Sequence, residues 1–203
     1  MIDVKQNDRL VVVSIDRQEK ANSLTRAMLN DLAEAVETTS VDESVNAMIL
    51  TGRGKVFSAG ADLEAARAGL ATDPVWERLS SAIAGAPVLT MAALNGTAAG
   101  GALGMVLATD LRVAHPDAKI FYPVMKLGFL PQPSDPGRLA ALVGSARAKL
   151  LLMGGARIEA VEALTMGLVD CVSETPLETA CGLAADALSA NRAHVAAIKA
   201  MLR

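Results

Sequence analysis

Short apolar runs alternate with segments of helical periodicity along the first two thirds of the chain. Helices are predicted over residues 24–36, with Ser23 as the N-cap, and over residues 74–84, with Asp73 as the N-cap. Runs of β-branched and aliphatic residues predict strands at 10–15, 47–51, 88–94, 111–114 and 120–121. Strands that alternate with helices in this way are typical of an α/β fold.

Two turns rich in glycine each follow a predicted strand and open a predicted helix. The first is Phe57-Ser-Ala-Gly-Ala-Asp-Leu63, and the second runs from Asn95 to Asp110, with a helix expected to start at about Gly101. Dense glycine indicates that main chain approaches something closely. Two such turns could present two backbone N–H groups to one oxygen atom, the arrangement that stabilises an oxyanion.

Beyond residue 138 the pattern is mainly helical, with one short strand predicted at 169–172. Helices are predicted at 139–143, at 146–153, at 159–166 with Gly167 as the C-cap, and in two alanine-rich segments that end at Arg203. No repeat or low-complexity linker interrupts the sequence. We therefore expect a single domain over residues 1–203, with an α/β part at 1–137 and a mainly helical part at 138–203.

Composition and charge exclude several classes of protein. The 203 residues are 52% hydrophobic but only 2% aromatic, so the core is predicted to be aliphatic. A net charge of −3 without a long basic run argues against nucleic acid as a partner. Cys171 and Cys181 lack metal-site spacing, and neither His115 nor His194 pairs with a nucleophile. With no membrane-length apolar run and no signal peptide, we expect a cytoplasmic protein that binds neither membrane nor metal.

Seven short motifs, including the two glycine turns, stand in order along the chain. They are Asn22-Ser-Leu24, Leu50-Thr-Gly52, Phe57 to Leu63, Asn95 to Gly101, Ala108-Thr-Asp110, Lys126-Leu-Gly128 and Ala163 to Val169. They resemble the successive motifs of the crotonase (enoyl-CoA hydratase/isomerase) superfamily, over residues 15–202. The resemblance implies a spiral of ββα units with a C-terminal helical region, assembled as a homotrimer or a dimer of trimers. It also implies an acyl-CoA thioester as ligand, with coenzyme A entering as part of the substrate and not as a separate cofactor.

The resemblance assigns residues to the site. The amides of Ala61 and Gly101 would form the oxyanion hole, and Lys20 would approach the CoA phosphates. Along the CoA moiety it places four residues of the first turn, Ala59, Gly60, Asp62 and Leu63. A helix N-cap is the alternative interpretation of Asp62, and a solvated surface lysine is the alternative for Lys20.

Two positions depart from the pattern of the family's hydratases, which use two glutamates to activate water. Gly104 and Val124 stand where those glutamates belong, and neither side chain can carry a proton. Gln132 stands where some isomerases and a dehalogenase of the family carry a carboxylate. The sequence therefore predicts a reaction other than simple hydration.

Three other residues are candidates for acid–base chemistry. Asp135 is the leading candidate for an active-site carboxylate, although Ser-Asp-Pro is also a good turn sequence whose residues are usually solvated. Glu64 follows the first oxyanion segment directly and could face the acyl pocket. Tyr122 could donate a proton, or simply pack and bond through its hydroxyl.

The leading interpretation is an enzyme of the enoyl-CoA hydratase/isomerase class, a lyase or isomerase of fatty acid metabolism that stabilises a thioester enolate. Proton transfer, decarboxylation and thioester cleavage all fit such a site. The alternatives are a non-catalytic acyl-CoA binding protein and a structural subunit that trimerises with active homologues. The resemblance implies further helices after residues 193–202, so the helical part is expected to be short for the family.

Overall fold

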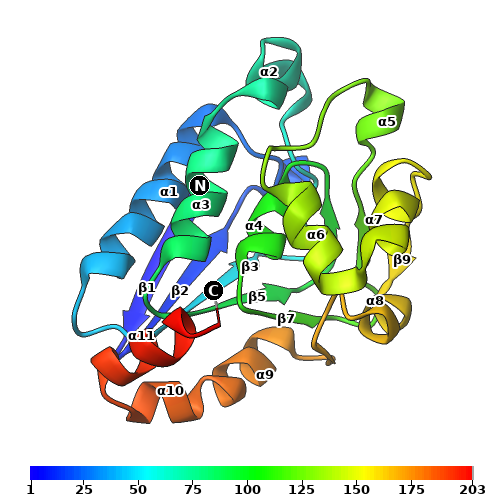
Figure 1. Cartoon of the computed structure of the whole chain (residues 1–203). Helices are drawn as coiled ribbons and strands as arrows, with labels where there is room; N and C mark the ends of the chain where they lie inside the picture. Colours follow the sequence, from blue (N-terminus) through cyan, green and yellow to red (C-terminus); the bar gives the residue numbers. More distant parts are fainter. Residues whose placement is uncertain (203) are drawn as a thin grey trace.

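The computed structural model describes residues 1–202, and two sheets form its centre (Figure 1). The strands are β1 (Ile2–Asn7), β2 (Leu10–Ile15), β3 (Ala47–Gly52), β4 (Val56–Ser58), β5 (Leu89–Leu94), β6 (Thr97–Ala99), β7 (Leu111–Ala114), β8 (Lys119–Phe121), β9 (Ile158–Glu159) and β10 (Cys171–Val172). The larger sheet has the order β1-β2-β3-β5-β7-β10, and the smaller has the order β4-β6-β8-β9. All neighbouring strands are parallel except the edge pairs β1–β2 and β8–β9.

A unit of two strands followed by a helix recurs along the chain. The helices are α1 (Arg26–Val41), α2 (Leu63–Arg67), α3 (Val75–Gly85), α4 (Ala102–Ala108), α5 (Val124–Leu127), α6 (Asp135–Val143), α7 (Ser145–Leu152), α8 (Ala160–Met166), α9 (Pro176–Leu183), α10 (Ala185–Ser189) and α11 (Arg192–Ala200), with 3-10 turns at 18–20 and 70–72. In β3–β4, β5–β6 and β7–β8, the first strand joins the larger sheet and the second joins the smaller. This is the spiral of ββα units that the motifs predicted.

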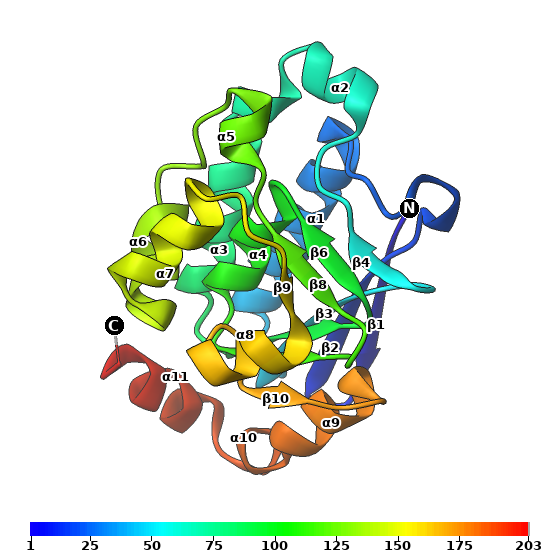
Figure 2. The ribbon, with the colours of Figure 1, turned by 90° about the vertical axis from the view of Figure 1, so that its right-hand side faces the viewer.

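The side chains of β3 show how the sequence sets the layers. Met48 and Leu50 belong to the main core, which also contains residues of α1, α3 and α4. Ala47 and Ile49 belong to a smaller cluster on the other face, which contains Ala180 of α9. Because side chains alternate across a strand, β3 is covered on both sides, as expected of a parallel strand. Figures 1 and 2 show α9 to α11 along the lower side of the molecule, with α1 and α3 on the other face of the sheet.

Several elements differ from the predictions. Thr25, not Ser23, caps α1, since its hydroxyl accepts the amide of Met28 at 3.3 Å. The edge strand β1 has no counterpart among the predicted strands because its mostly polar sequence carries no apolar run. The two predicted C-terminal helices are three, α9, α10 and α11, and Asn191 caps the last of them by accepting the Ala193 amide at 2.8 Å. The predicted end of the last helix, Arg203, lies outside the described residues.

None of the helices among residues 1–202 is both long enough and apolar enough to cross a lipid bilayer.

Candidate active site

The two glycine turns lie against each other. They follow β4 and β6, which pair in parallel. A Cβ on Gly60 would lie 2.7 Å from the carbonyl oxygen of Ala99 and 3.2 Å from the backbone nitrogen of Gly101. Gly60 also has a φ of +91°, which L side chains rarely adopt. Residue 60 must therefore be glycine, and the turns are brought together as the sequence predicted.

The backbone around Ala61 directs its amide away from the neighbouring segment. The Leu24 amide donates to the carbonyl oxygen of Gly60 at 2.8 Å, and the Asp62 amide donates to the carbonyl oxygen of Leu24 at 2.9 Å. In this parallel bridge between Leu24 and Ala61, the bonded groups belong to the residues on either side of Ala61. The Ala61 N–H therefore points to the opposite side, where no acceptor is found within residues 1–202.

Gly101 is the N-cap of α4 and has no capping side chain. The preceding Gly100 has a φ of +57° and donates its amide to the carbonyl oxygen of Phe121 at 3.1 Å, which fixes the turn against β8. The first hydrogen bonds of the following turn are donated by Leu103 and Gly104, so the Gly101 amide precedes them. Two adjoining turns thus each carry an amide, Ala61 and Gly101, that the local backbone does not use.

Asp62 is a helix N-cap, as one of its two interpretations predicted. Its carboxylate accepts the amides of Glu64 at 3.1 Å and Ala65 at 3.2 Å, and the guanidinium of Arg17 at 2.9 Å. The hydrogen bonds from the Ala65 amide and Arg17 lower the pKa of Asp62. Arg17 also donates to the carbonyl oxygen of Ser23 at 3.1 Å, so it joins the first turn to the segment before α1. A contact of Asp62 with coenzyme A stays a prediction.

Of the other residues assigned to the CoA moiety, all but the buried Gly60 are exposed around the first turn. Leu63 and Glu64 lie exposed on α2, and Ala59 is exposed beside them. The Ala59 amide donates to the carbonyl oxygen of Ala21 at 3.0 Å, which places the exposed Lys20 next to this turn. The structure thus places Lys20, Ala59 and Leu63 exposed at or beside the first turn, and it leaves the Glu64 side chain on the outside of the molecule.

Asp135, in contrast, is fully buried. Its predicted alternative as a solvated turn residue is wrong, because it is the first residue of α6 and has 0% exposure. The Tyr122 hydroxyl donates to Oδ2 at 2.8 Å, whereas Oδ1 has no hydrogen-bond partner in the part of the chain that the structure describes. Burial raises the pKa of Asp135 to about 6, against the opposing effect of the Tyr122 hydrogen bond.

The free oxygen of Asp135 faces α4. A Cβ on Gly104 would lie 3.1 Å from Asp135 Oδ1 and 3.3 Å from Oδ2. Gly104 comes three residues after Gly101, so the carboxyl lies beside the first turn of the helix that Gly101 begins. Burial and the nearby Asp135 raise the pKa of Tyr122, so its hydroxyl keeps its proton and acts as a donor. Val124, the second of the two residues expected to replace the glutamates of the family's hydratases, has a buried apolar side chain.

Contacts from α3 hold the segment that ends at Asp135. The Glu77 carboxylate accepts the amide of Ser134 at 3.2 Å and a hydrogen bond from its hydroxyl. Burial opposes these bonds, but together with one from Ser81 they lower the pKa of Glu77. Gln132 is also buried and donates to the carbonyl oxygen of Ala71 at 3.3 Å. Gln132, which the resemblance compares with a carboxylate of some isomerases, therefore makes a hydrogen bond that joins two segments of the fold.

Trp76 lies at the site, which the sequence did not indicate. A Cβ on Gly101 would lie 3.1–3.2 Å from three adjacent carbons of the six-membered ring of Trp76. The indole is 3% exposed, and its N–H donates to the carbonyl oxygen of Leu70 at 2.8 Å. The apolar periodicity of α3 predicts that Trp76 faces the core, but it does not say which backbone the ring covers.

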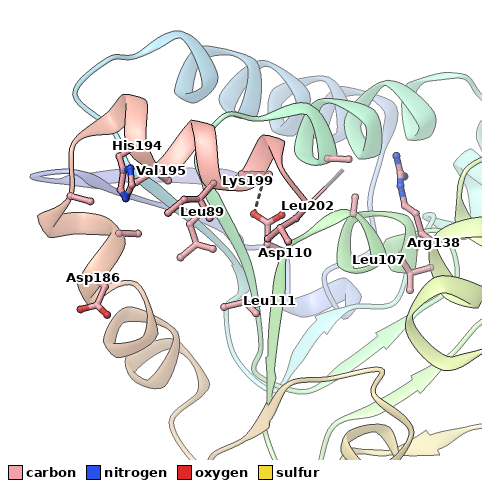
Figure 3. Close-up of a pocket in the computed structure, with 15 residues that line it drawn as sticks. Leu89, Leu107, Asp110, Leu111, Arg138, Asp186, His194, Val195, Lys199 and Leu202 are labelled. Atoms are coloured by element: carbon pink, nitrogen blue, oxygen red, sulfur yellow. Dashed lines mark hydrogen bonds and ion pairs between the residues drawn. The ribbon is translucent and has the colours of Figure 1, made fainter.

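The larger described cavity lies elsewhere. It has a volume of about 800 Å³ and lies between the larger sheet, the C-terminal end of α4 and helices α10 and α11 (Figure 3). Leu107 and Ala108 line it at the end of α4 opposite to Gly101, and Lys199 pairs with Asp110 inside it at 2.7 Å. It includes none of the predicted site residues. Among residues 1–202, no three His, Cys, Asp or Glu side chains are grouped so as to hold a metal ion.

Comparison with known proteins gives consistent results. Residues 5–203 match the family model described as enoyl-CoA hydratase/isomerase. The chain is 34% identical over 200 residues to "Probable enoyl-CoA hydratase EchA14" of Mycobacterium tuberculosis, an alignment that covers 96% of this chain and 78% of that protein. It is also 34% identical over 175 residues to "Putative enoyl-CoA hydratase/isomerase YngF" of Bacillus subtilis, covering 83% of this chain and 67% of that protein.

Solved structures agree over nearly the full chain. The enoyl-CoA hydratase/isomerase from Pseudoalteromonas atlantica superposes with a TM-score of 0.92 and 30% identity, covering 99% of this chain and 82% of that one. The enoyl-CoA hydratase from Bacillus anthracis gives a TM-score of 0.90 and 31% identity, covering 99% and 81%.

Proposed function

The chain belongs to the enoyl-CoA hydratase/isomerase family and has the crotonase fold, and on this premise we propose that it binds an acyl-CoA thioester and stabilises its enolate. The amides of Ala61 and Gly101 bind the thioester oxygen and form the oxyanion hole. Their location on adjoining turns, with neither amide used by the local backbone, supports this assignment. Removing one such donor typically costs ~10²–10³ in rate.

The coenzyme A moiety lies along the exposed first turn, with Ala59, Gly60, Asp62 and Leu63. Lys20, beside this turn, neutralises part of the phosphate charge. No cofactor is needed besides the CoA of the substrate, because an enolate forms from a thioester by transfer of a proton alone. The exposure of Ala59, Leu63 and Lys20 around this turn supports this placement, with Asp62 half-buried and Gly60 buried beneath them.

Asp135 is the acid–base group of the proposed reaction, and its burial and hydrogen bonding are the observation that carries the proposal. Tyr122 occupies Oδ2, which leaves Oδ1 as the oxygen that can accept a proton. Oδ1 takes the proton from the carbon next to the thioester carbonyl while the carbonyl becomes an enolate held by the two amides. A pKa of about 6 leaves Asp135 mostly ionised at neutral pH, yet able to return the proton.

Simple hydration is not the reaction that these residues support. Hydratases of the family activate water with two glutamates, and Gly104 and Val124 stand at those positions. The Asp135 carboxyl remains, and it lies next to the position that a side chain on residue 104 would occupy. A single acid–base group suits proton transfer at the α-carbon better than the addition of water.

Proton exchange tests the proposal directly. Butyryl-CoA is incubated with the protein in D₂O, and the loss of α-proton signal is followed by NMR. We expect exchange with the wild type, none with Asp135→Asn, and strong loss with Gly101→Pro if that variant stays folded. Glu162→Gln, an exposed carboxylate on α8, is the matched control and should exchange at the wild-type rate.

The outcomes separate the candidate functions. Exchange that persists in Asp135→Asn would show that the carboxyl is assigned wrongly. No exchange by the wild type, with acyl-CoA binding intact, would favour a non-catalytic binding protein. Rapid loss of enoyl absorbance with crotonyl-CoA would show that hydration does occur, and some other group would then have to activate water.

A further inference from the structure

Trp76 closes the interior of the site next to one of the two amides. The near-equal distances from a Cβ on Gly101 to three ring carbons place that position over the face of the six-membered ring. The ring therefore covers the Gly101 backbone within van der Waals distance. An acyl group bonded to a carbonyl at the Gly101 amide starts beside this ring.

The indole is held in this position from several sides. Its N–H bonds to the carbonyl oxygen of Leu70, and the Asp73 carboxylate accepts the Val75 amide at 2.8 Å at the start of α3. Asp73, which precedes α3, is also paired with Arg26, and Glu77, next to Trp76, binds Ser134. The start of the helix is therefore tied to two other segments. Rotating the ring away would break the Leu70 bond and leave a buried N–H unpaired.

The remaining sides of this space are closed as well. Tyr122 and Asp135 are buried, and Asp135 lies directly against Gly104. The buried side chains of Trp76, Tyr122 and Asp135 thus surround the start of α4, where the Gly101 amide lies.

We propose that Trp76 determines substrate specificity by limiting the acyl group to short chains, such as acetyl, butyryl or crotonyl. This inference rests on the proposed function, because it requires the thioester carbonyl to lie at the two amides. A longer chain meets the indole face and gains no apolar contact beyond it. Each methylene that does find apolar surface is worth about fourfold in affinity, so the limit is measurable as a break in a chain-length series.

Calorimetry with CoA, acetyl-CoA, butyryl-CoA and octanoyl-CoA tests this specificity. We expect the wild type to bind butyryl-CoA more tightly than CoA, and octanoyl-CoA no more tightly than butyryl-CoA. Trp76→Leu should bind octanoyl-CoA at least tenfold more tightly than the wild type does, with acetyl-CoA unchanged within about twofold. Ile83→Ala, which removes a buried side chain of the same helix two turns away, should keep the wild-type series.

The results distinguish failure of this inference from failure of the proposed function. Tighter binding of octanoyl-CoA than butyryl-CoA by the wild type would overturn the role of Trp76 and leave the proposed function intact. An unchanged series in folded Trp76→Leu would do the same. Equal affinity of the wild type for CoA and acetyl-CoA would overturn both. If Trp76→Leu does not fold, Trp76→Phe, which shortens the ring system, should still shift the break toward longer chains.

Discussion

The first glycine turn and the Asp135 carboxyl both belong to the proposed site but are built by different means. In the turn, the proposed functional groups are backbone amides, and Ala59, Leu63 and Glu64 around it are exposed. In the interior, the proposed functional groups are side chains with almost no exposure, contributed by α3, α6 and the segment after β8. The turn depends on which residues have no Cβ, whereas the interior depends on which distant elements meet. Mutations should therefore affect the two regions in different ways.

Gly60→Ala is expected to give the largest effect. Its Cβ would lie 2.7 Å from the carbonyl oxygen of Ala99 at a φ of +91°, so the two turns must separate. We expect a loss of more than about 3 kcal/mol in the free energy of unfolding. Any folded protein should bind butyryl-CoA no better than CoA. Urea unfolding and calorimetry measure the two effects.

Gly137→Ala is the matched control for this substitution. Gly137 lies in α6 with no atom within 4 Å of an added Cβ, and its φ is not positive. Alanine there should be neutral or should stabilise by about 0.4–1 kcal/mol. If Gly60→Ala behaves like this control, the contact between the turns is not what fixes the two amides.

The pH dependence of the free energy of unfolding tests the buried Asp135 carboxyl and not the exposed turn. Because folding raises the pKa of Asp135 from 3.8 to about 6, the folded state binds more protons than the unfolded state between these values. This contribution to stability is fully present below pH 3.8 and is lost as the pH rises to about 6. Its full size is about 3 kcal/mol. Urea unfolding of the wild type and Asp135→Asn at intervals between pH 4 and 8 measures it.

The difference between the two proteins isolates Asp135 from the other carboxylates. Glu77 and Asp62 have lowered pKa values and give pH slopes of the opposite sign, but they are present in both proteins. If the wild-type stability curve ran parallel to that of Asp135→Asn across this pH window, burial would not raise the pKa of the Asp135 carboxyl.

Tyr122→Phe should have a smaller effect on the same curve. The Tyr122 hydroxyl bond to Oδ2 lowers the pKa of Asp135, so its loss should raise that pKa further above the ordinary value. We expect the pH window to extend upward and the stability at pH 8 to fall by about 1.5–3 kcal/mol. Proton exchange on butyryl-CoA, followed against pH, should show the same shift. A profile identical to that of the wild type would mean that Tyr122 does not position the carboxyl.

The sequence predicted the exposed turn well because its signal is local. Strand, glycine turn and helix follow one another within a few residues, and the seven motifs fix their order along the fold. The resemblance of these motifs to those of the family could therefore assign both amides, Ala61 and Gly101, and the structure brings their turns together. The contact of Asp62 with the start of α2 was likewise one of two local interpretations.

The interior could not be read in the same way because its contacts join distant segments. Ser134 binds Glu77, which lies 57 residues earlier, and Gln132 binds Ala71, 61 residues earlier. These contacts fix a proline-rich stretch, which has the composition of a solvated loop, directly before the buried Asp135. The contact of Trp76 with Gly101 is similar, since helical periodicity gives the face of α3 but not its partner.

Lys20→Ala should give the smallest effect, and it returns to the exposed side of the comparison. Lys20 is exposed beside the first turn, so its attraction to CoA phosphates acts through water and is screened by salt. An exposed ion pair of this kind is worth about 0.2–1 kcal/mol, or a factor of roughly 1.5–5 in the Kd for CoA. Calorimetry at low and high salt should show the difference shrinking as salt rises. Lys149→Ala, an exposed lysine on α7, should leave the Kd unchanged at both, because only charge beside the turn contributes. Equal losses of CoA affinity in the two variants would show that only the net charge matters. Lys20 would then not belong to the site, and the assignment of the buried residues would be unaffected.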